Sequence, residues 1–146
     1  MKAVINTVAT SIQTEVVASI GSPTIKKYDR IWRNPTDGKV LSIYGGREFP
    51  GEFRTTGNRE DIFEVILEYC EPSDAQVLDK VEASELALYD VASALKEWAD
   101  NHQTLTGIHR FDWVGTDHSP IMRGQELLTR FFQMRFQARG VEAYGS

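Results

Sequence analysis

The sequence predicts an α+β fold, a mainly antiparallel β-sheet packed by an N-terminal helix and one long central helix. Over residues 132–139, apolar and polar side chains alternate strictly, which predicts a strand with one face against a core. Over residues 74–101, apolar side chains instead recur every three or four positions, the spacing of a helix that lies across a sheet. The remaining segments are interpreted around these two elements.

The first element is a predicted helix over residues 3–20. Gly21 and Pro23 follow it as stop signals. Its apolar side chains have the spacing of one helical stripe: Ile5, Val8, Ile12, Val16 and Ile20.

A hairpin is expected next. Residues 25–33 and 40–44 are rich in β-branched and aromatic side chains, and the turn-forming sequence from Asn34 to Gly38 separates them. Two such strands with a short turn should pair antiparallel. Residues 45–60 are interrupted by Pro50 and several glycines, which predicts a long loop. Loops longer than about twelve residues in compact domains are usually functional or mobile.

Residues 61–70 predict a strand with alternating apolar and acidic side chains. Ser73 and Gln76 then have the spacing of a capping box that would begin the central helix. Residues 107–116 predict another strand, with Phe111 and Trp113 on one face. The central helix has this expected apolar stripe: Val77, Val81, Leu88, Val91, Leu95 and Trp98.

Length and charge exclude several classes of protein. The chain has 146 residues, which we interpret as one domain over residues 1–146. No apolar run approaches the ~20 residues that cross a bilayer, so we expect no membrane association and place the chain in a cytoplasm. The net charge of −5 lacks the basic excess of a general nucleic-acid binder. Residues 74–101 carry seven acids against two bases, whereas residues 25–60 carry eight bases against five acids.

The residues with catalytic or metal-binding chemistry do not form a recognisable motif. Cys70 is the only cysteine, and we expect it to be a buried structural residue. His118 stands between Asp117 and Ser119, but adjacent residues on an extended chain point in opposite directions, so residues 117–120 predict a connecting loop. His102 is expected at the C-terminal end of the central helix, where the helix dipole favours it. No cofactor, metal ligand or catalytic residue is predicted.

One segment has the composition of an interface. Arg47, Phe49, Phe53 and Arg54 combine arginine with aromatic side chains, as protein interfaces do. Equally compatible with the sequence is a role for the two phenylalanines in covering the sheet edge. In a protein that assembles head-to-tail into a ring, the opposed charges of residues 25–60 and 74–101 would help to set the register of the copies. Solvation of the charged side chains alone would also account for them.

The order of elements resembles that of the tail terminator proteins of long-tailed bacteriophages. The residues that carry the resemblance are the junction over residues 66–73, the helix stripe through Trp98 and the final strand over residues 132–136. The resemblance implies a non-enzymatic virion protein that is assembled in the host cytoplasm and located in the tail or neck. It implies a hexameric ring that caps the tail tube, ends tail polymerisation and presents a surface to the head connector, while DNA passes through its channel without specific binding.

Three alternatives stay open. Some head-completion and neck proteins of the same viruses share this fold, and a monomeric adaptor would use the same aromatic segment. A small metal-dependent hydrolase would use His109, Asp112 and His118, although the odd separation of the first two places them on opposite faces of a strand.

Overall fold

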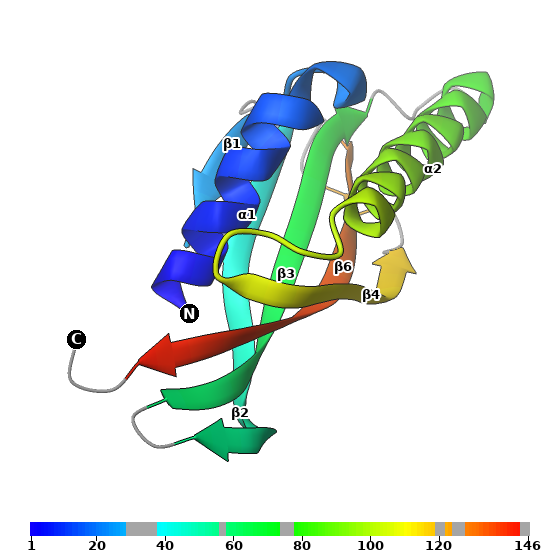
Figure 1. Ribbon diagram of the computed structural model, residues 1–146. Coiled ribbons are helices and arrows are strands. Elements are labelled where there is room, and N and C mark those ends of the chain that lie inside the picture. Colours follow the sequence, from blue (N-terminus) through cyan, green and yellow to red (C-terminus); the bar gives the residue numbers. More distant parts are fainter. Residues whose placement is uncertain (29–37, 56–57, 74–77, 119–121, 124–127, 144–146) are drawn as a thin grey trace.

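The computed structural model describes residues 1–28, 38–55, 58–73, 78–118, 122–123 and 128–143, and it confirms the α+β fold. Two helices pack on one mixed sheet (Figure 1). In chain order the elements are α1 (Lys2–Glu15), the 3-10 helix η1 (Val17–Ile20), β1 (Thr24–Lys27), β2 (Val40–Thr55), β3 (Asn58–Ser73), α2 (Leu78–Asn101), β4 (Ile108–His118), β5 (Met122–Arg123) and β6 (Leu128–Ala143).

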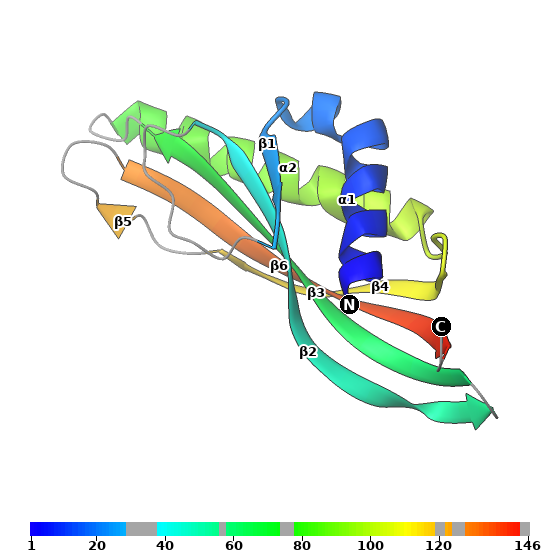
Figure 2. The ribbon, with the colours of Figure 1, turned by 90° about the vertical axis from the view of Figure 1, so that its left-hand side faces the viewer.

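The strand order of the sheet is β1-β2-β3-β6-β4, and β5 pairs with one end of β6. All pairs are antiparallel except β1 with β2. Both helices lie on one face, with α1 over β1 and β2 and α2 over β6 and β4. In Figure 2, the ends of β2, β3 and β6 curve away as a ribbon that extends beyond the helices. We call the uncovered side of the sheet the helix-free face.

The N-terminal helix is confirmed, with one refinement. The α-helix ends at Glu15 and a turn of 3-10 helix continues to Ile20. Gly21 then adopts the left-handed conformation with φ +84°, as its position after the apolar stripe predicts. The whole predicted stripe from Ile5 to Ile20 is buried against the sheet, so its burial offsets the modest helix propensity of its β-branched residues.

The predicted antiparallel hairpin is wrong. β1 pairs with β2 in parallel, with Thr24 opposite Val40 and Lys27 opposite Ile43. A parallel pair needs a connection of about a dozen residues that returns to the starting end, and residues 28–39 supply that length. Most of the turn-like sequence from Asn34 to Gly38 lies outside the described residues. Its composition is compatible with a hairpin turn and with the longer connection of a parallel pair, so the sequence did not distinguish the two.

The long loop predicted over residues 45–60 is also wrong. β2 continues to Thr55 and β3 begins at Asn58, so this segment forms most of a β-ribbon. Two register shifts, between Gly45 and Glu48 and between Pro50 and Arg54, accommodate the glycines and the proline. In the described residues β1 pairs with β2 only as far as Ile43, so beyond this point β3 is the one described neighbour of β2, and proline is tolerated on such an edge strand.

The other strand predictions are confirmed and extended. The predicted strand over residues 61–70 is the middle of β3, and its predicted core-facing side chains are 0–4% exposed. β4 continues to His118, so the loop predicted over residues 117–120 is wrong for its first two residues. The four predicted core side chains of the final strand are all fully buried: Phe132, Met134, Phe136 and Ala138.

The central helix begins at Leu78, and residues 74–77 lie outside the described part of the chain, as does the expected capping contact between Ser73 and Gln76. From Leu88 onward the predicted apolar stripe is buried, as Leu88, Val91, Leu95 and Trp98 show. Cys70 is buried, as expected. In the described residues, no helix has both the length and the apolar character that crossing a membrane requires.

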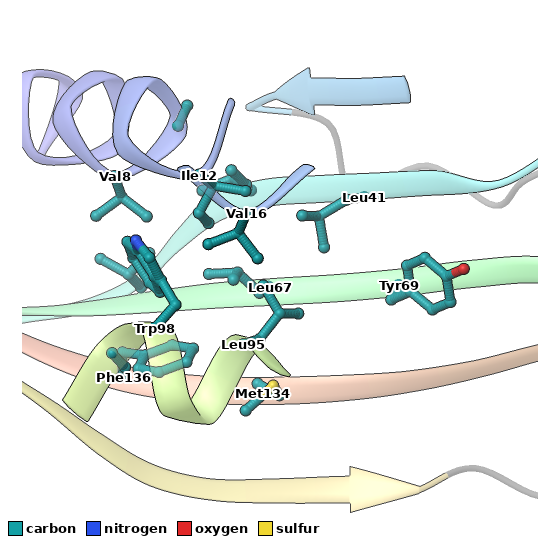
Figure 3. Packing of buried hydrophobic residues seen from close by; sticks show 14 of the residues in the cluster. Val8, Ile12, Val16, Leu41, Leu67, Tyr69, Leu95, Trp98, Met134 and Phe136 are labelled. Carbon is teal, nitrogen blue, oxygen red and sulfur yellow. The ribbon is translucent and has the colours of Figure 1, made fainter. Parts of the chain in front are cut away.

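Trp98 lies at the centre of the core, between α1, α2 and the sheet (Figure 3). Its indole ring meets Phe111 of β4 edge-on at 5.5 Å between centroids and Phe136 of β6 at 6.4 Å. The same ring donates a hydrogen bond through Nε1 to Ser11 Oγ of α1, at 3.0 Å. One side chain thus joins both helices to the sheet.

A closed set of polar contacts surrounds this indole. Ser11 donates to Glu15 Oε2 at 3.2 Å, and Glu15 contacts Nε2 of His102. His102 lies just beyond α2, as predicted; its Nδ1 is 2.8 Å from the Trp98 carbonyl oxygen, and its ring stacks on the indole. The C-terminal end of α2 is therefore tied to the C-terminal half of α1.

Tyr69 is another polar group within the core. Its ring stacks on Phe132 and its hydroxyl donates to Glu71 Oε2 at 2.9 Å. Burial, together with the adjacent Glu71 carboxylate, raises the pKa of Tyr69 well above its ordinary value near 10. The hydroxyl therefore remains a hydrogen-bond donor throughout the neutral and moderately alkaline range.

We expect Trp98→Ala to lower the free energy of unfolding by about 3–5 kcal/mol, because it leaves a large cavity and removes the donor to Ser11. The matched control is Trp113→Ala, since Trp113 is 37% exposed and its loss should cost roughly 1 kcal/mol or less. Urea denaturation followed by circular dichroism measures both. Equal losses for the two variants would contradict the central role of Trp98.

The raised pKa of Tyr69 predicts a loss of stability in alkali. Below about pH 10 the hydroxyl is protonated in both states, and above it the unfolded chain binds fewer protons than the folded chain, so the free energy of unfolding falls as pH rises. We expect Tyr69→Phe to cost about 1–3 kcal/mol at pH 7 and to flatten this alkaline decline. Urea titrations of both proteins at about pH 7, 9, 10 and 11 measure the free energy of unfolding on both sides of the ordinary tyrosine pKa. If the free energy fell equally steeply with pH in the variant and the wild type, the prediction would be contradicted.

Candidate assembly interface

The sequence-predicted interface residues all lie on β2, with Arg47 within the first register shift and Phe49, Phe53 and Arg54 beyond it. Arg47 is exposed and Phe49 is half-buried, and the guanidinium of Arg47 lies 4.8 Å from the centre of the Phe49 ring. This cation–π pair holds the arginine along the open edge of β2. The contact partly covers Phe49 and leaves Arg47 exposed, and the interface role of both residues stays a prediction.

The other two predicted residues, Phe53 and Arg54, lie farther along β2, near its hairpin connection to β3. Arg54 is opposite Arg59 in the strand register. The structure thus places all four residues on one strand, and the side chains of Phe53 and Arg54 lie outside its described part.

The ribbon depends on a close approach at Gly51. A Cβ atom at this position would lie 2.6 Å from the backbone oxygen of Glu60 on β3, closer than real contacts allow. On the same stretch of β3, the Glu60 side chain is mostly buried, 3.2 Å from His109 Nε2 and 4.0 Å from Arg139 Nη1. These contacts join β3, β4 and β6 where the ribbon leaves the body of the sheet.

The helix-free face carries a chain of polar contacts across the central strands. Tyr44 donates its hydroxyl to Glu68 at 2.9 Å and accepts from Gln133 Nε2 at 3.0 Å. Arg135 lies beside Gln133 at 3.4 Å and within 4.0 Å of Asp117. These side chains are therefore largely paired with one another.

The three residues of the hydrolase alternative do not converge. His109 contacts Glu60, and Asp112 accepts from Arg110 Nε at 2.7 Å. His118 is at the far end of β4, on the helix-covered face, where its ring lies against Tyr89 and Phe132. Across the described ranges, no group of three or more His, Cys, Asp or Glu side chains has a metal-binding arrangement.

A groove between α2 and β4 was missed by the sequence analysis. It has a volume of about 280 Å³, and its aromatic walls are Tyr89 of α2 and Trp113 of β4. Trp113 shares a face with Phe111, as predicted, but Phe111 packs under Trp98 and is buried, whereas Trp113 lies beside the Lys96 side chain and is 37% exposed. Alternation along a strand predicts on which face a side chain lies. Which side chains of β4 are then buried depends on where α2 crosses the strand.

The charges of the two flanks are opposite. Among the described side chains, Lys26, Lys27, Lys39 and Arg47 lie along the β1–β2 edge, with Glu48 as an acid beside Arg47. Along α2, at the other side of the sheet, the charged side chains are mainly acidic: Glu85, Asp90, Glu97 and Asp100, with Lys96. The strand order therefore converts the charge asymmetry of the sequence into two separate surfaces, which we call the basic edge and the acidic flank.

No family model and no curated protein matches the chain. Among solved structures, a chain of the "Virion of native gene transfer agent (GTA) particle" is similar in fold, with a TM-score of 0.51. The two chains are 16% identical, and the similarity covers 94% of this chain and 93% of that one. At this identity the likeness shows a shared fold over nearly the full length of both.

The close approach at Gly51 generates a prediction. We expect Gly51→Ala to lower the free energy of unfolding by about 1–3 kcal/mol, because the added methyl group forces the two strands of the ribbon apart. Gly115→Ala is the matched control, since a Cβ at Gly115 of β4 meets nothing within 4 Å. Hydrogen exchange of the β2 and β3 amides locates the effect. A ribbon equally protected in both variants would contradict it.

Proposed function

We propose that this chain is a structural protein of a phage-like virion, and that it acts as a subunit of a ring, with six copies expected, that caps the tail tube, ends tail polymerisation and forms the surface that joins the head. The observation that carries the proposal is the fold shared with a chain of a gene transfer agent virion over nearly the whole length. The resemblance of the element order to tail terminator proteins supports the finer role.

The position of the charges supports assembly into a ring. A head-to-tail ring needs two different surfaces of one chain that complement each other. The basic edge and the acidic flank are two such surfaces, at opposite ends of the strand order. Opposite charges steer encounter and disfavour contacts between like surfaces, so they favour the head-to-tail arrangement over a two-fold dimer.

The net acidity of the chain is compatible with a channel through which DNA passes without being held. With a formal charge of −5 and no basic excess, the ring would offer few cationic side chains that could displace the counterions of the DNA phosphates. The partners of the proposal are further copies of the chain, the tube protein and the head connector. Its location in the particle is the tail or neck.

The proposal is tested by the mass and shape of the purified protein. We expect light scattering to give six times the monomer mass, alone or with tube protein, and negatively stained images to show a ring with a central hole. Added before tube polymerisation, the ring should shorten the tubes. A protein that stays monomeric under both conditions, or that leaves tube length unchanged, would contradict the role of terminator.

Two charge-reversal variants distinguish a specific effect of the basic edge on assembly from an effect of the net charge. We expect Arg47→Glu to weaken ring formation at least several-fold, because it reverses one charge of the basic edge. Arg135→Glu changes the net charge equally but lies on the helix-free face, and it should leave assembly unchanged. Raising the salt concentration to about 1 M, where the screening length falls to roughly 3 Å, should weaken the wild-type ring as well.

A further inference from the structure

Exposed apolar side chains of the described residues gather on α2 and β4, and two of them, Tyr89 and Trp113, line the groove between these elements. Five large hydrophobic side chains in the described residues are exposed, and four of them lie on these two elements. They are Leu86, Tyr89, Trp113 and Val114. Exposed aromatic side chains that border a groove are typical of protein interfaces, whereas isolated exposed hydrophobic residues need no explanation.

The walls of the groove are held in place before any partner binds. Trp113 donates through Nε1 to Thr116 Oγ1 at 3.0 Å, and the ammonium group of Lys96 lies 4.2 Å from the centre of its ring. On the other wall, Tyr89 meets the His118 ring edge-on at 5.0 Å between centroids. Aromatic side chains fixed in this way lose little conformational entropy on binding, which makes them suitable anchors.

The acidic side chains of α2 border the groove. Leu86, Asp90, Glu97 and Asp100 recur at helical spacing as one stripe, next to the stripe that carries Tyr89 and Lys96 into the groove. A partner that fills the groove therefore also meets exposed carboxylates. The chemistry expected of this partner is an apolar or aromatic side chain flanked by lysine or arginine.

The basic edge of the same chain has this chemistry. Tyr28, the fifth exposed hydrophobic side chain, follows Lys26 and Lys27 directly, and it is 47% exposed. Its hydroxyl donates to Asn6 Oδ1 at 2.7 Å, so its position is fixed against α1. This edge and the groove lie at opposite ends of the strand order, so one chain cannot bring them together and two copies can.

We propose that the α2–β4 groove is the receiving half of a head-to-tail contact and that the β1–β2 edge of a second copy of this chain occupies it. The inference rests on the proposed ring and names the two surfaces that build it. Aromatic anchors in the groove supply the apolar contact, and the charges around them fix the register. The contact leaves the helix-free face and the far end of the ribbon open to other proteins.

The contact is tested by photo-crosslinking within the assembled protein. A benzophenone amino acid replaces Trp113 in one isotopically labelled chain, which is mixed with unlabelled wild-type chain and irradiated. We expect adducts between chains that map to residues 24–28 or 39–47. The matched control places the same group at Asp112, one residue away on the helix-free face, and should give few adducts with that edge.

Substitutions provide the second measurement. Tyr89→Ala and Trp113→Ala should each raise the dissociation constant between copies at least tenfold, with unchanged circular dichroism, whereas Asp112→Ala should have no effect. Rings that persist in both groove variants, or adducts that map elsewhere, would overturn this contact and leave the proposed ring intact. A monomeric wild-type chain would overturn both, and rings that use the groove but do not shorten tubes would overturn only the role of terminator.

Discussion

The packing of Trp98 is the constraint on which the rest of the structure depends. One face of the sheet is apolar and must be buried by the two helices. These helices are distant in sequence, so side-chain packing has to fix their positions. Trp98 meets that requirement with a single side chain, because its ring packs on Phe111 and Phe136 while its Nε1–H reaches Ser11 of α1. The carboxylate of Glu15 and the ring of His102 then close the polar contacts around it.

This arrangement also defines what remains exposed. With α1 over β1 and β2 and α2 over β6 and β4, the helices cover the central part of one face of the sheet and leave its two flanks and the ribbon uncovered. The position of α2, fixed by Trp98 at its C-terminal end, sets which part of β4 stays uncovered. The groove at Trp113 and Tyr89 is thus a consequence of how the core packs.

The sequence predicted those features that depend on local periodicity. The alternation from Phe132 to Ala138 and the helical stripe from Leu88 to Trp98 were sufficient because one face of each element is buried and the other is not. The pairing of β1 was beyond such reasoning, since the same turn-rich connection serves a hairpin or a parallel return. The ribbon was missed because Pro50 and the glycines interrupt strands only where a second neighbour must pair with them, and β2 has an open edge there.

For the candidate interface too, the sequence predicted what depends on local composition and not what depends on tertiary packing. Composition gave Arg47 and Phe49 as interface candidates on a loop, whereas the structure places them on strand β2, and their role in an interface stays a prediction. Tyr89 and Trp113 were not identified, since their exposure follows from the crossing of two elements that are distant in sequence. The hydrogen bonds of Tyr44, Glu68 and Gln133 already use much of the polar capacity of the helix-free face. The flanks carry exposed aromatic side chains and opposite charges, and they are therefore the surfaces that we propose for assembly.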